Sequence, residues 1–477
     1  MKAFDAAIIG AGVTGAALAR ELSRYRVSVL LLEKEAEPAF GVSKSNSGII
    51  HAGTQNPPGS LKARLCVEGN RLIAGPLAAE LGLDFIRCGQ LIAVFDPADL
   101  PRLERIKSEG EAMGVEGLRI VDRAWLEANE PNLGPEVRAA LFCPTAGMIS
   151  PYRFVYALVE NAAANGTELR TGSEVAAISR GADGVFALVA GGQEYRARFV
   201  VNAAGLYADR IAALAGLPPY PIKPRKGEEY LLDRKREHIA NHIIFPLPSG
   251  KSKGILIIKT SDGNPMIGPT AHDTGDSGDL STTDEGLAEV LAGARRMMPS
   301  ISRSDIIAYF AGLRPAAGDD FVIRHEDALP GFFSAAGIQS PGLTAAPAIA
   351  LMLARLMEGR GLKLEPKKDF RPLREKPVHL FQVSPERTRE LIAEDPGYGD
   401  IVCRCEMVSA REIRDAIKRG ARTLDGVKFR TRAQAGRCHG GFCTTRIMKI
   451  MREELALSPL AVTKRGAGSE IIKDERK

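Results

Sequence analysis

The N-terminal part of the chain alternates between continuous apolar runs and a helical pattern. Residues Phe4–Ile9 and 27–32 are short apolar runs, as in strands that are buried on both faces of a sheet. Between these runs, small and apolar residues recur at helical spacing over residues 13–24. The pattern predicts a strand, a helix and a second, parallel strand, which together form a βαβ unit.

Two later apolar runs also end in glycine turns that precede helices. The run at residues 199–201 leads into Asn-Ala-Ala-Gly at residues 202–205, and the run Phe332–Ala336 leads into the glycine-bearing segment 337–344. The intervening segments read as short strands and charged helices. Because strand–glycine–helix junctions return late in the chain, the pattern indicates one parallel-sheet domain interrupted by inserted segments.

We therefore predict an α/β chain with a discontinuous Rossmann-like domain and an inserted α+β domain whose sheet is mixed and mainly antiparallel. A stretch rich in Lys, Arg and Pro is predicted to be a linker with one short helix at residues 385–392. The predicted boundaries are residues 1–80, 146–215 and 311–365 for the first domain, 81–145 and 216–310 for the insertion, 366–398 for the linker, 399–455 for a small helical domain and 456–477 for a tail.

The turn of the first βαβ unit has Gly-x-Gly-x-x-Gly spacing, at Gly10, Gly12 and Gly15. The first glycine permits a tight turn, the second lets a pyrophosphate approach the backbone, and the third lets the helix pack on the sheet. Glu33 ends the second apolar run, where a carboxylate can accept hydrogen bonds from ribose hydroxyls. The combination predicts a dinucleotide site, although the glycines of an ordinary βαβ unit serve only to turn the chain.

Composition limits the class of protein without identifying it. The 477 residues are 45% hydrophobic and 26% charged, as in a globular protein of several domains. The net charge of +6 favours anionic substrates or partners over general nucleic-acid binding. The longest apolar stretch, residues 343–356, is broken by Pro347 and Arg355, so we expect no transmembrane segment, and membrane association only through a partner. We also expect no signal peptide and a cytoplasmic location.

Four of the seven cysteines are grouped near the C-terminus. Cys403 and Cys405 are spaced Cys-x-Cys, and Cys438 and Cys443 follow after two predicted short helices. A capping box, Ser409-x-x-Glu412, opens the first of these helices. Four thiolates on loops at helix ends suit a [2Fe–2S] cluster or tetrahedral zinc, and the spacing favours the cluster because zinc sites more often use Cys-x-x-Cys.

Basic residues accompany this cysteine group. They are Lys428, Arg430, Arg432 and Arg437. The simplest interpretation is a solvated basic face. They could also bind an acidic electron-transfer partner or offset the charge of a thiolate-bound cluster. Nucleic-acid binding is a weaker alternative, and we expect no nucleic-acid partner.

The chain resembles the FAD-dependent glycerol-3-phosphate dehydrogenase group of the D-amino-acid oxidase-like (DAO) superfamily. The likeness runs from residue 3 to about residue 365, and residues 399–455 resemble the iron–sulfur domain of bacterioferritin-associated ferredoxin (BFD-like). Over the whole chain it is most similar to the A subunits of anaerobic glycerol-3-phosphate dehydrogenases. The segments that carry the resemblance are the turn with Gly10, Gly12, Gly15 and Glu33, and residues 47–53, 59–69, 202–205 and 337–344.

The resemblance implies a glutathione-reductase-type FAD domain. The FAD-binding residues that it implies are Gly10, Gly12, Gly15, Glu33, Ser45, Ser47, Gly48, Ala204, Gly205, Gly337, Gln339, Gly342, Leu343 and Thr344. It also implies a [2Fe–2S] cluster on Cys403, Cys405, Cys438 and Cys443, with zinc as the alternative occupant. The chain departs from the family where Pro-Thr usually precedes Gly-Asn, because residues 259–262 read Lys-Thr-Ser-Asp.

The reaction hypothesis is oxidation of an anionic secondary alcohol, sn-glycerol 3-phosphate to dihydroxyacetone phosphate. His51 is the candidate base, because an unperturbed imidazole titrates near neutral pH and the family places this residue beside the flavin. A satisfied structural histidine is the alternative. Arg314 could grip a phosphate or carboxylate bidentately, and Lys259 is a second candidate cation. Hydride would pass to flavin N5, and single electrons through the cluster to a partner subunit or ferredoxin-like protein.

Other functions fit the same sequence. L-2-hydroxyglutarate or another 2-hydroxy acid is a rival substrate, and related subunits with the same cysteine domain suggest amine or amino-acid oxidation. A redox-sensing subunit without turnover, or a zinc-bearing nucleic-acid adaptor, would belong to a different class.

Overall fold

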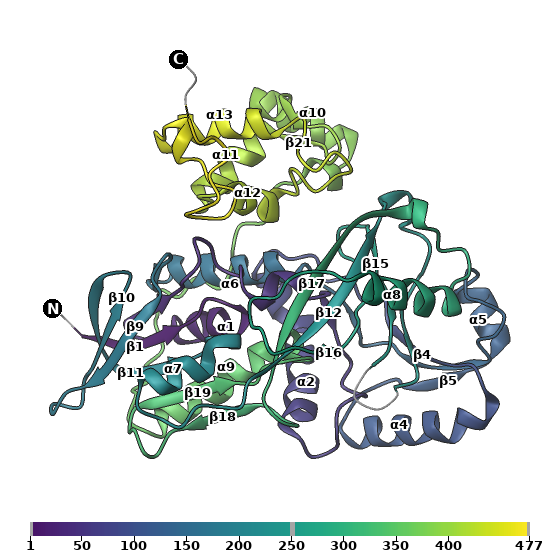
Figure 1. Cartoon of the computed structure of the whole chain (residues 1–477), viewed down its shortest axis with the longest axis horizontal. Helices are drawn as coiled ribbons and strands as arrows, with labels where there is room; N and C mark the ends of the chain where they lie inside the picture. The colour runs from purple at the N-terminus through teal and green to yellow at the C-terminus, as the bar shows by residue number, and fades with distance from the viewer. Residues whose placement is uncertain (1–2, 249–252, 475–477) are drawn as a thin grey trace.

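The computed structural model describes residues 3–248 and 253–474. Two sheets lie side by side, and a smaller helical domain, yellow in Figure 1, sits over helix α6 (Pro151–Ala164). No helix among the described residues is long and apolar enough to cross a membrane. The fold is α/β with mixed and antiparallel sheets, as predicted.

The first sheet is parallel through its centre. Its strands follow the order β18-β19-β11-β1-β2-β8, the hairpin β9–β10 extends from β11, and only the edge strand β18 runs antiparallel to its neighbour on the main path. The strands are β1 (Phe4–Ile9), β2 (Val29–Leu32), β8 (Glu168–Arg170), β9 (Val175–Arg180), β10 (Phe186–Ala190), β11 (Gln193–Asn202), β18 (Val322–His325) and β19 (Phe332–Ala336).

Both faces of this sheet are covered, which explains its continuous apolar runs. Alternate strand residues such as Ile8 pack into one core with three helices, whereas Ile9 packs into another core with the β9–β10 hairpin and a short helix. The helices of the first core are α1 (Val13–Leu22), α6 and α9 (Gly342–Glu358), and the short helix is α7 (Ala208–Leu214). The neighbouring helices are α2 (Leu61–Leu72) and α3 (Ala78–Glu80).

The second sheet is mainly antiparallel. Its order is β16-β12-β15-β14-β13-β4-β6-β5, with β17 also paired to β12, and only β13 and β4 run parallel. Its strands are β4 (Gln90–Val94), β5 (Arg119–Val121), β6 (Ala139–Cys143), β12 (Lys223–Leu232), β13 (Ile243–Pro246), β14 (Leu256–Lys259), β15 (Pro265–Gly268), β16 (His272–Asp273) and β17 (Ile306–Ala316). The long strand β17 leads from this sheet back toward the first one.

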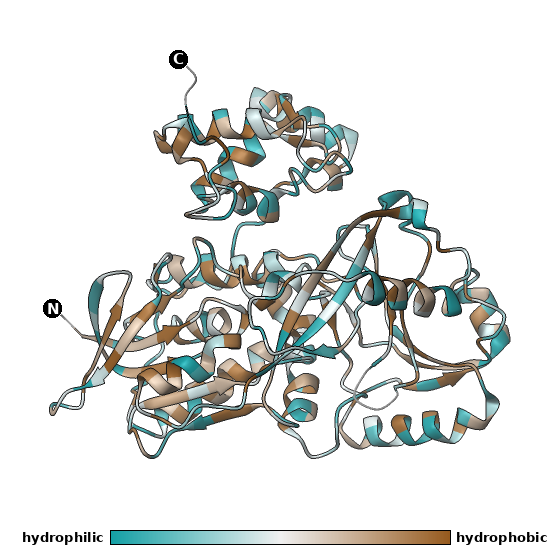
Figure 2. Ribbon diagram, viewed as in Figure 1, coloured by the Kyte–Doolittle hydropathy of each residue, from teal (hydrophilic) through white to brown (hydrophobic). Residues whose placement is uncertain are grey.

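Helices cover the second sheet as amphipathic layers. Leu126, Val290 and Met297 pack on one face, and Leu103 packs on the other. They belong to α5 (Arg123–Asn129), α8 (Asp284–Met297) and α4 (Leu100–Ala112). Figure 2 shows α4 with alternating teal and brown turns, as expected of a helix with one buried and one solvated side.

The C-terminal domain has its own apolar core. Ile413, Ala416 and Ile417 form the stripe of α11 (Ala410–Lys418), and the predicted capping box is present: Ser409 Oγ accepts from Glu412 N, and the Glu412 carboxylate accepts from Ser409 N. Its other elements are α12 (Leu424–Thr431), α13 (Thr444–Leu455), β20 (Ile401–Cys403) and β21 (Val408–Ser409). The segment before it carries α10 (Pro385–Glu394), close to the predicted linker helix.

Short elements complete the chain. They are β3 (Ile49–Ile50) and its partner β7 (Gly147–Met148), η1 (Val42–Ser45), η2 (Ile73–Leu77), η3 (Pro97–Asp99), η4 (Gly205–Tyr207), η5 (Arg234–Arg236), η6 (Arg303–Asp305), η7 (Leu380–Gln382), η8 (Pro396–Tyr398) and η9 (Pro459–Ala461).

Candidate functional site

The glycine turn after β1 is tightly packed. Gly10 has a positive φ of 106°, and a Cβ on Gly15 would lie 1.9 Å from the Gly10 carbonyl oxygen, so both positions require glycine. Ala11 N donates to Glu33 Oε2 at 2.8 Å, which fixes the acid that ends β2 beside the turn. Helix α1 has Gly12 as its N-cap residue, with no side-chain cap and no acidic residue in its first turn. Its positive end is therefore available to phosphates.

A large cavity of about 740 Å³ opens at this turn. Its size and its mainly apolar lining with a few polar groups are those of a cofactor site. Eight of the predicted cofactor residues line it: Gly10, Gly12, Glu33, Ala204, Gly205, Gln339, Gly342 and Leu343. Ser43 and Tyr207 also line it, although sequence reasoning missed them. Ser43 accepts from Val13 N at 3.0 Å, a contact across 30 residues that has no local signal.

The other predicted cofactor residues lie behind this lining and hold it in place. A Cβ on Gly337 would meet Ala317 Cβ at 2.7 Å. Ser45 Oγ donates to Val42 O within η1. These contacts fit a supporting role for the loops around the cavity. The remaining members of the set are Gly15, packed on Gly10; Gly48, packed on Ile149; Ser47, bonded to Glu229; and Thr344, bonded to His51 N and Ile49 O.

His51 follows the short strand β3 and is held from two sides. Its backbone N–H donates to Thr344 Oγ1 at 3.0 Å, and its ring Nε2 lies 3.5 Å from Ser340 Oγ. Burial and the nearby positive charge of Lys253 lower the pKa of His51 well below its usual value. The imidazole is therefore neutral at pH 7 and able to accept a proton.

Lys253 is the cation whose charge acts on the His51 imidazole. Its Nζ is buried and has no hydrogen-bond partner within the described part of the chain. Burial, together with the charges of Arg314 and Lys62, lowers the pKa of Lys253 to about 8. A buried, unpaired ammonium is costly, so this group is suited to an anionic ligand. Sequence reasoning missed it, because a lysine in a Lys-Ser-Lys-Gly loop is typical of a solvated turn.

Arg314 lies on β17 and lines the cavity. Among the described residues, its Nη1 and Nη2 reach only the Thr270 carbonyl oxygen, at 3.3 and 3.4 Å, and burial lowers its pKa. The nearby Glu229 carboxylate accepts from Ser47 Oγ at 3.0 Å, and burial raises the pKa of Glu229 to about 7. The weak contacts of the guanidinium leave donors for a ligand.

Lys259 ends β14, near Cys88, where its charge favours the thiolate of that residue. The lysine whose charge acts on His51 is Lys253, and the charge of Arg314 acts on Lys253 in turn. A role for Lys259 in substrate binding stays a prediction.

The four C-terminal cysteines are arranged as two pairs. Cys405 Sγ lies 3.5 Å from Cys438 Sγ, and a hydrogen bond with Cys443 lowers the pKa of Cys403 to about 6. The described residues include no group of three or more His, Cys, Asp or Glu side chains set around a single metal position. Two thiol pairs match the donor set of a [2Fe–2S] cluster, in which each of two irons takes two protein ligands.

Arg432 connects the cysteine loops to the second sheet. Its guanidinium pairs with Glu406 at 2.7 Å and with Asp262 at 2.9 Å, and it donates to Asn264 Oδ1 at 2.6 Å. Glu406 directly follows Cys405, whereas Asp262 and Asn264 form the turn between β14 and β15. The Arg432 side chain is only 6% exposed, so the expectation of a solvated basic face is wrong here.

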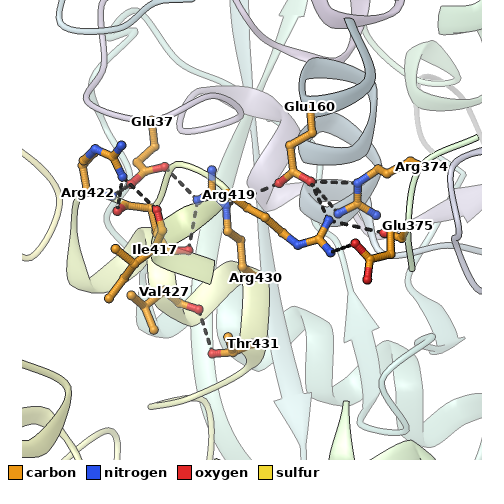
Figure 3. A network of polar contacts seen from close by, with 12 residues as sticks. Glu37, Glu160, Arg374, Glu375, Ile417, Arg419, Arg422, Val427, Arg430 and Thr431 are labelled. Atoms are coloured by element: carbon orange, nitrogen blue, oxygen red, sulfur yellow. Dashed lines mark hydrogen bonds and ion pairs between the residues drawn. The ribbon is translucent and has the colours of Figure 1, made fainter. Parts of the chain in front are cut away.

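Arg430 is buried in a second network, shown in Figure 3. It pairs with Glu37 at 2.8 Å and lies 3.7 Å from Glu160, which also pairs with Arg374 at 2.7 Å. Glu37 follows β2 and is 1% exposed. The basic-face expectation is also wrong for Arg430, because this network consists of buried ion pairs between domains.

Two family models match the chain. A model described as FAD dependent oxidoreductase matches residues 5–356, and one described as BFD-like [2Fe-2S] binding domain matches residues 401–453. These ranges contain the cavity residues from Ile9 to Leu343 and the four cysteines, respectively.

Known proteins share this architecture. Glycerol 3-phosphate dehydrogenase of Caloramator mitchellensis is 39% identical over 472 residues, which is 98% of each protein. The mitochondrial L-2-hydroxyglutarate dehydrogenase of Bos taurus is 32% identical over 322 residues, 64% of this chain and 67% of that protein. The structure of dithionite-reduced L-alpha-glycerophosphate oxidase from Mycoplasma pneumoniae with FAD bound superposes with a TM-score of 0.75 at 30% identity, covering 79% of this chain and 100% of the other. The chain therefore belongs to the FAD dependent oxidoreductase family, with a BFD-like [2Fe–2S] domain near its C-terminus.

Proposed function

We propose that the protein is a dehydrogenase that oxidises sn-glycerol 3-phosphate to dihydroxyacetone phosphate and passes the electrons to a partner protein. The observation that carries this proposal is a group of buried side chains next to the cavity lining: the cation Arg314, which lines the cavity, the cation Lys253, whose charge acts on His51, and a neutral His51, whose ring meets Ser340 of the lining. When bound, FAD supplies the two-electron acceptor and a [2Fe–2S] cluster carries single electrons.

The residues at the cavity lining and directly behind it support a division of roles between base and anchor. His51 would take the proton from the substrate hydroxyl, because its neutral imidazole is a base and its ring is oriented by Ser340. Arg314 and Lys253 would hold the phosphate, since a dianion offsets two buried positive charges and the guanidinium can form two parallel hydrogen bonds. Holding the phosphate fixes the carbinol carbon relative to the base.

Other residues would hold the cofactors. The uncapped start of α1 and the glycine turn would receive the FAD pyrophosphate, and Glu33 would accept from a ribose hydroxyl. Cys403 with Cys443, and Cys405 with Cys438, would each bind one iron. The relatives are glycerol 3-phosphate and L-2-hydroxyglutarate enzymes by name, and both substrates are anionic secondary alcohols.

Anaerobic bleaching of the flavin distinguishes these substrates. FAD-loaded protein is mixed without oxygen with sn-glycerol 3-phosphate, L-2-hydroxyglutarate or glycine, and the loss of flavin absorbance is followed. We expect glycerol 3-phosphate to bleach the flavin fastest, and the variant Lys253→Met to require about tenfold more of it, as for a lost charge-assisted contact. Lys235→Met, at an exposed lysine, is the matched control. Faster bleaching by L-2-hydroxyglutarate would show that Lys253 and Arg314 bind a substrate carboxylate and not a phosphate. No bleaching by any of the three compounds would refute the proposal.

A further inference from the structure

The two cysteine loops expose apolar side chains at the surface. Phe442, next to Cys443, is 84% exposed, and Met407, two residues after Cys405, is 49% exposed. Cys405 itself is exposed, whereas Cys403 and Cys443 are buried. Large apolar side chains beside an exposed ligand residue are unexpected in a surface that meets only water, and aromatic residues and methionine are enriched in protein interfaces.

The opposite side of the same loops is already occupied. Glu406 points inward to Arg432, Arg437 pairs with Asp233, which directly follows β12, and the His439 ring contacts the Ile307 carbonyl oxygen at 3.0 Å. These contacts fix one side of the cysteine loops against the body of the protein. The side with Phe442, Met407 and Cys405 is the one that remains accessible from outside.

Basic side chains outnumber acidic ones around the accessible side. Segments 401–407 and 436–449 contain a single acidic residue, Glu406, and that residue is buried against Arg432. Arg404, Arg446 and Lys449 are exposed there; Arg446 pairs with Asp400, and Lys449 lies 4.0 Å from Glu453. Arg404 has no ion-pair partner among the described residues. A basic rim around an apolar centre is complementary to a protein with an acidic rim.

We propose that the outer face, defined as Arg404, Cys405, Met407 and Phe442, docks an acidic one-electron carrier protein. The proposal rests on the proposed function, because a carrier is needed only when the cysteines hold a redox cluster. Phe442 and Met407 supply the apolar contact, and Arg404 with the neighbouring cations attracts and orients the carrier. A cluster held by the four cysteines would pass its electrons to the carrier on the side of the loops where Cys405 is exposed.

The test uses the full chain, loaded with FAD and cluster, and two c-type cytochromes of opposite net charge as probes. The protein is reduced anaerobically, either by substrate or by dithionite that is then removed, and haem reduction is followed at several salt concentrations. We expect the acidic cytochrome to be reduced about tenfold faster than the basic one at low salt, and this advantage to disappear at high salt.

Two variants address the outer face directly. Phe442→Ser and Arg404→Glu should slow reduction of the acidic cytochrome about fivefold and tenfold, respectively, and leave flavin bleaching and the cluster absorbance unchanged. The matched controls are Leu373→Ser, at a leucine that is 74% exposed in the linker, and Lys363→Glu, at an exposed lysine.

The outcomes separate this proposal from the proposed function. Equal rates for the variants and controls, preference for the basic cytochrome, or no reduction of either cytochrome by protein whose cluster is reduced would overturn the docking face. If substrate fails to bleach the flavin but dithionite-reduced protein shows the expected charge preference, the proposed function fails and the docking face stands.

Discussion

At His51, burial and a neighbouring cation act on the imidazole in the same direction. Both disfavour the imidazolium, so the pKa of His51 falls well below its usual value and the base form persists at and below neutral pH. Lys253, by contrast, limits the pH range on its alkaline side. Because burial lowers its pKa to about 8, it is charged at neutral pH and loses its charge in mildly alkaline solution. The two groups together define a neutral pH window for binding an anion and removing a proton.

This window predicts a pH profile for oxidation of glycerol 3-phosphate. In the free enzyme kcat/KM should be constant through neutral pH and fall above about pH 8, because deprotonated Lys253 no longer attracts the phosphate. The Lys253→Met variant should have a lower kcat/KM without this alkaline decrease, whereas Lys235→Met should retain the wild-type profile. An alkaline decrease that persists in Lys253→Met would assign the titration to another group.

The β14–β15 turn shows how a departure from the family pattern acquires a structural role. Burial alone would raise the pKa of Asp262, but Arg153 and Arg432 hold it well below its usual range. Asp262 also accepts from Tyr152 Oη at 2.9 Å. Asp262 is the last residue of the segment Lys-Thr-Ser-Asp at positions 259–262, where the family usually has Pro-Thr. It anchors the C-terminal domain through its ion pair with Arg432.

Removing this anchor should be costly. We expect Asp262→Asn to lower the free energy of unfolding by about 3 kcal/mol, because two buried guanidinium groups lose their carboxylate. The same contribution should be present above about pH 4 and be lost as the pH falls further, since the folded-state pKa is depressed. Thermal unfolding followed by circular dichroism measures the change. The control Asp99→Asn removes an exposed pair with Arg102 and should cost less than about 1 kcal/mol; a similar loss in both variants would contradict the role of Asp262.

At the scale of the whole molecule, Glu37 links the segment after β2 to the C-terminal domain (Figure 3). Its carboxylate accepts from the backbone N–H groups of Arg422 and Thr423, at the start of α12, and from Arg430 Nη1 at 2.8 Å. A carboxylate at a helix N-terminus is stabilised by both the free N–H groups and the helix dipole. These contacts hold the C-terminal domain, which follows the linker, against α6.

Glu37→Gln should loosen this docking. A loss of about 2 kcal/mol in charge-assisted hydrogen bonds would raise the population of the detached domain about thirtyfold. Limited trypsin digestion should therefore cleave within residues 366–398 correspondingly faster, with the sites read by mass spectrometry. Glu127→Gln, which removes an exposed pair with Arg123, is the control. Cleavage at the control rate would show that Glu37 does not hold the domain.

Much of this fold is predictable because its signals are local. The glycine turn, the buried strand runs and the capping box at Ser409 each depend on residues close together in the chain, and the structure contains all of them. Gly10 and Leu343, two of the residues that the sequence assigns to a cofactor site, line the cavity. By contrast, Ser43 and Glu229 acquire their positions only through partners far away in the sequence.

The sequence by itself determined the α/β architecture, the dinucleotide turn and the cysteine group, because glycine spacing, hydrophobic period and thiol spacing are properties of short segments. Only the tertiary structure decided the environment of each charge. Lys253 looks solvated in sequence but is buried beside His51, and Arg430 and Arg432 look like a basic surface but neutralise buried carboxylates. Burial and distant partners determine the free energy of a charged group in the folded protein, and neither can be predicted from the residues next to it in the sequence.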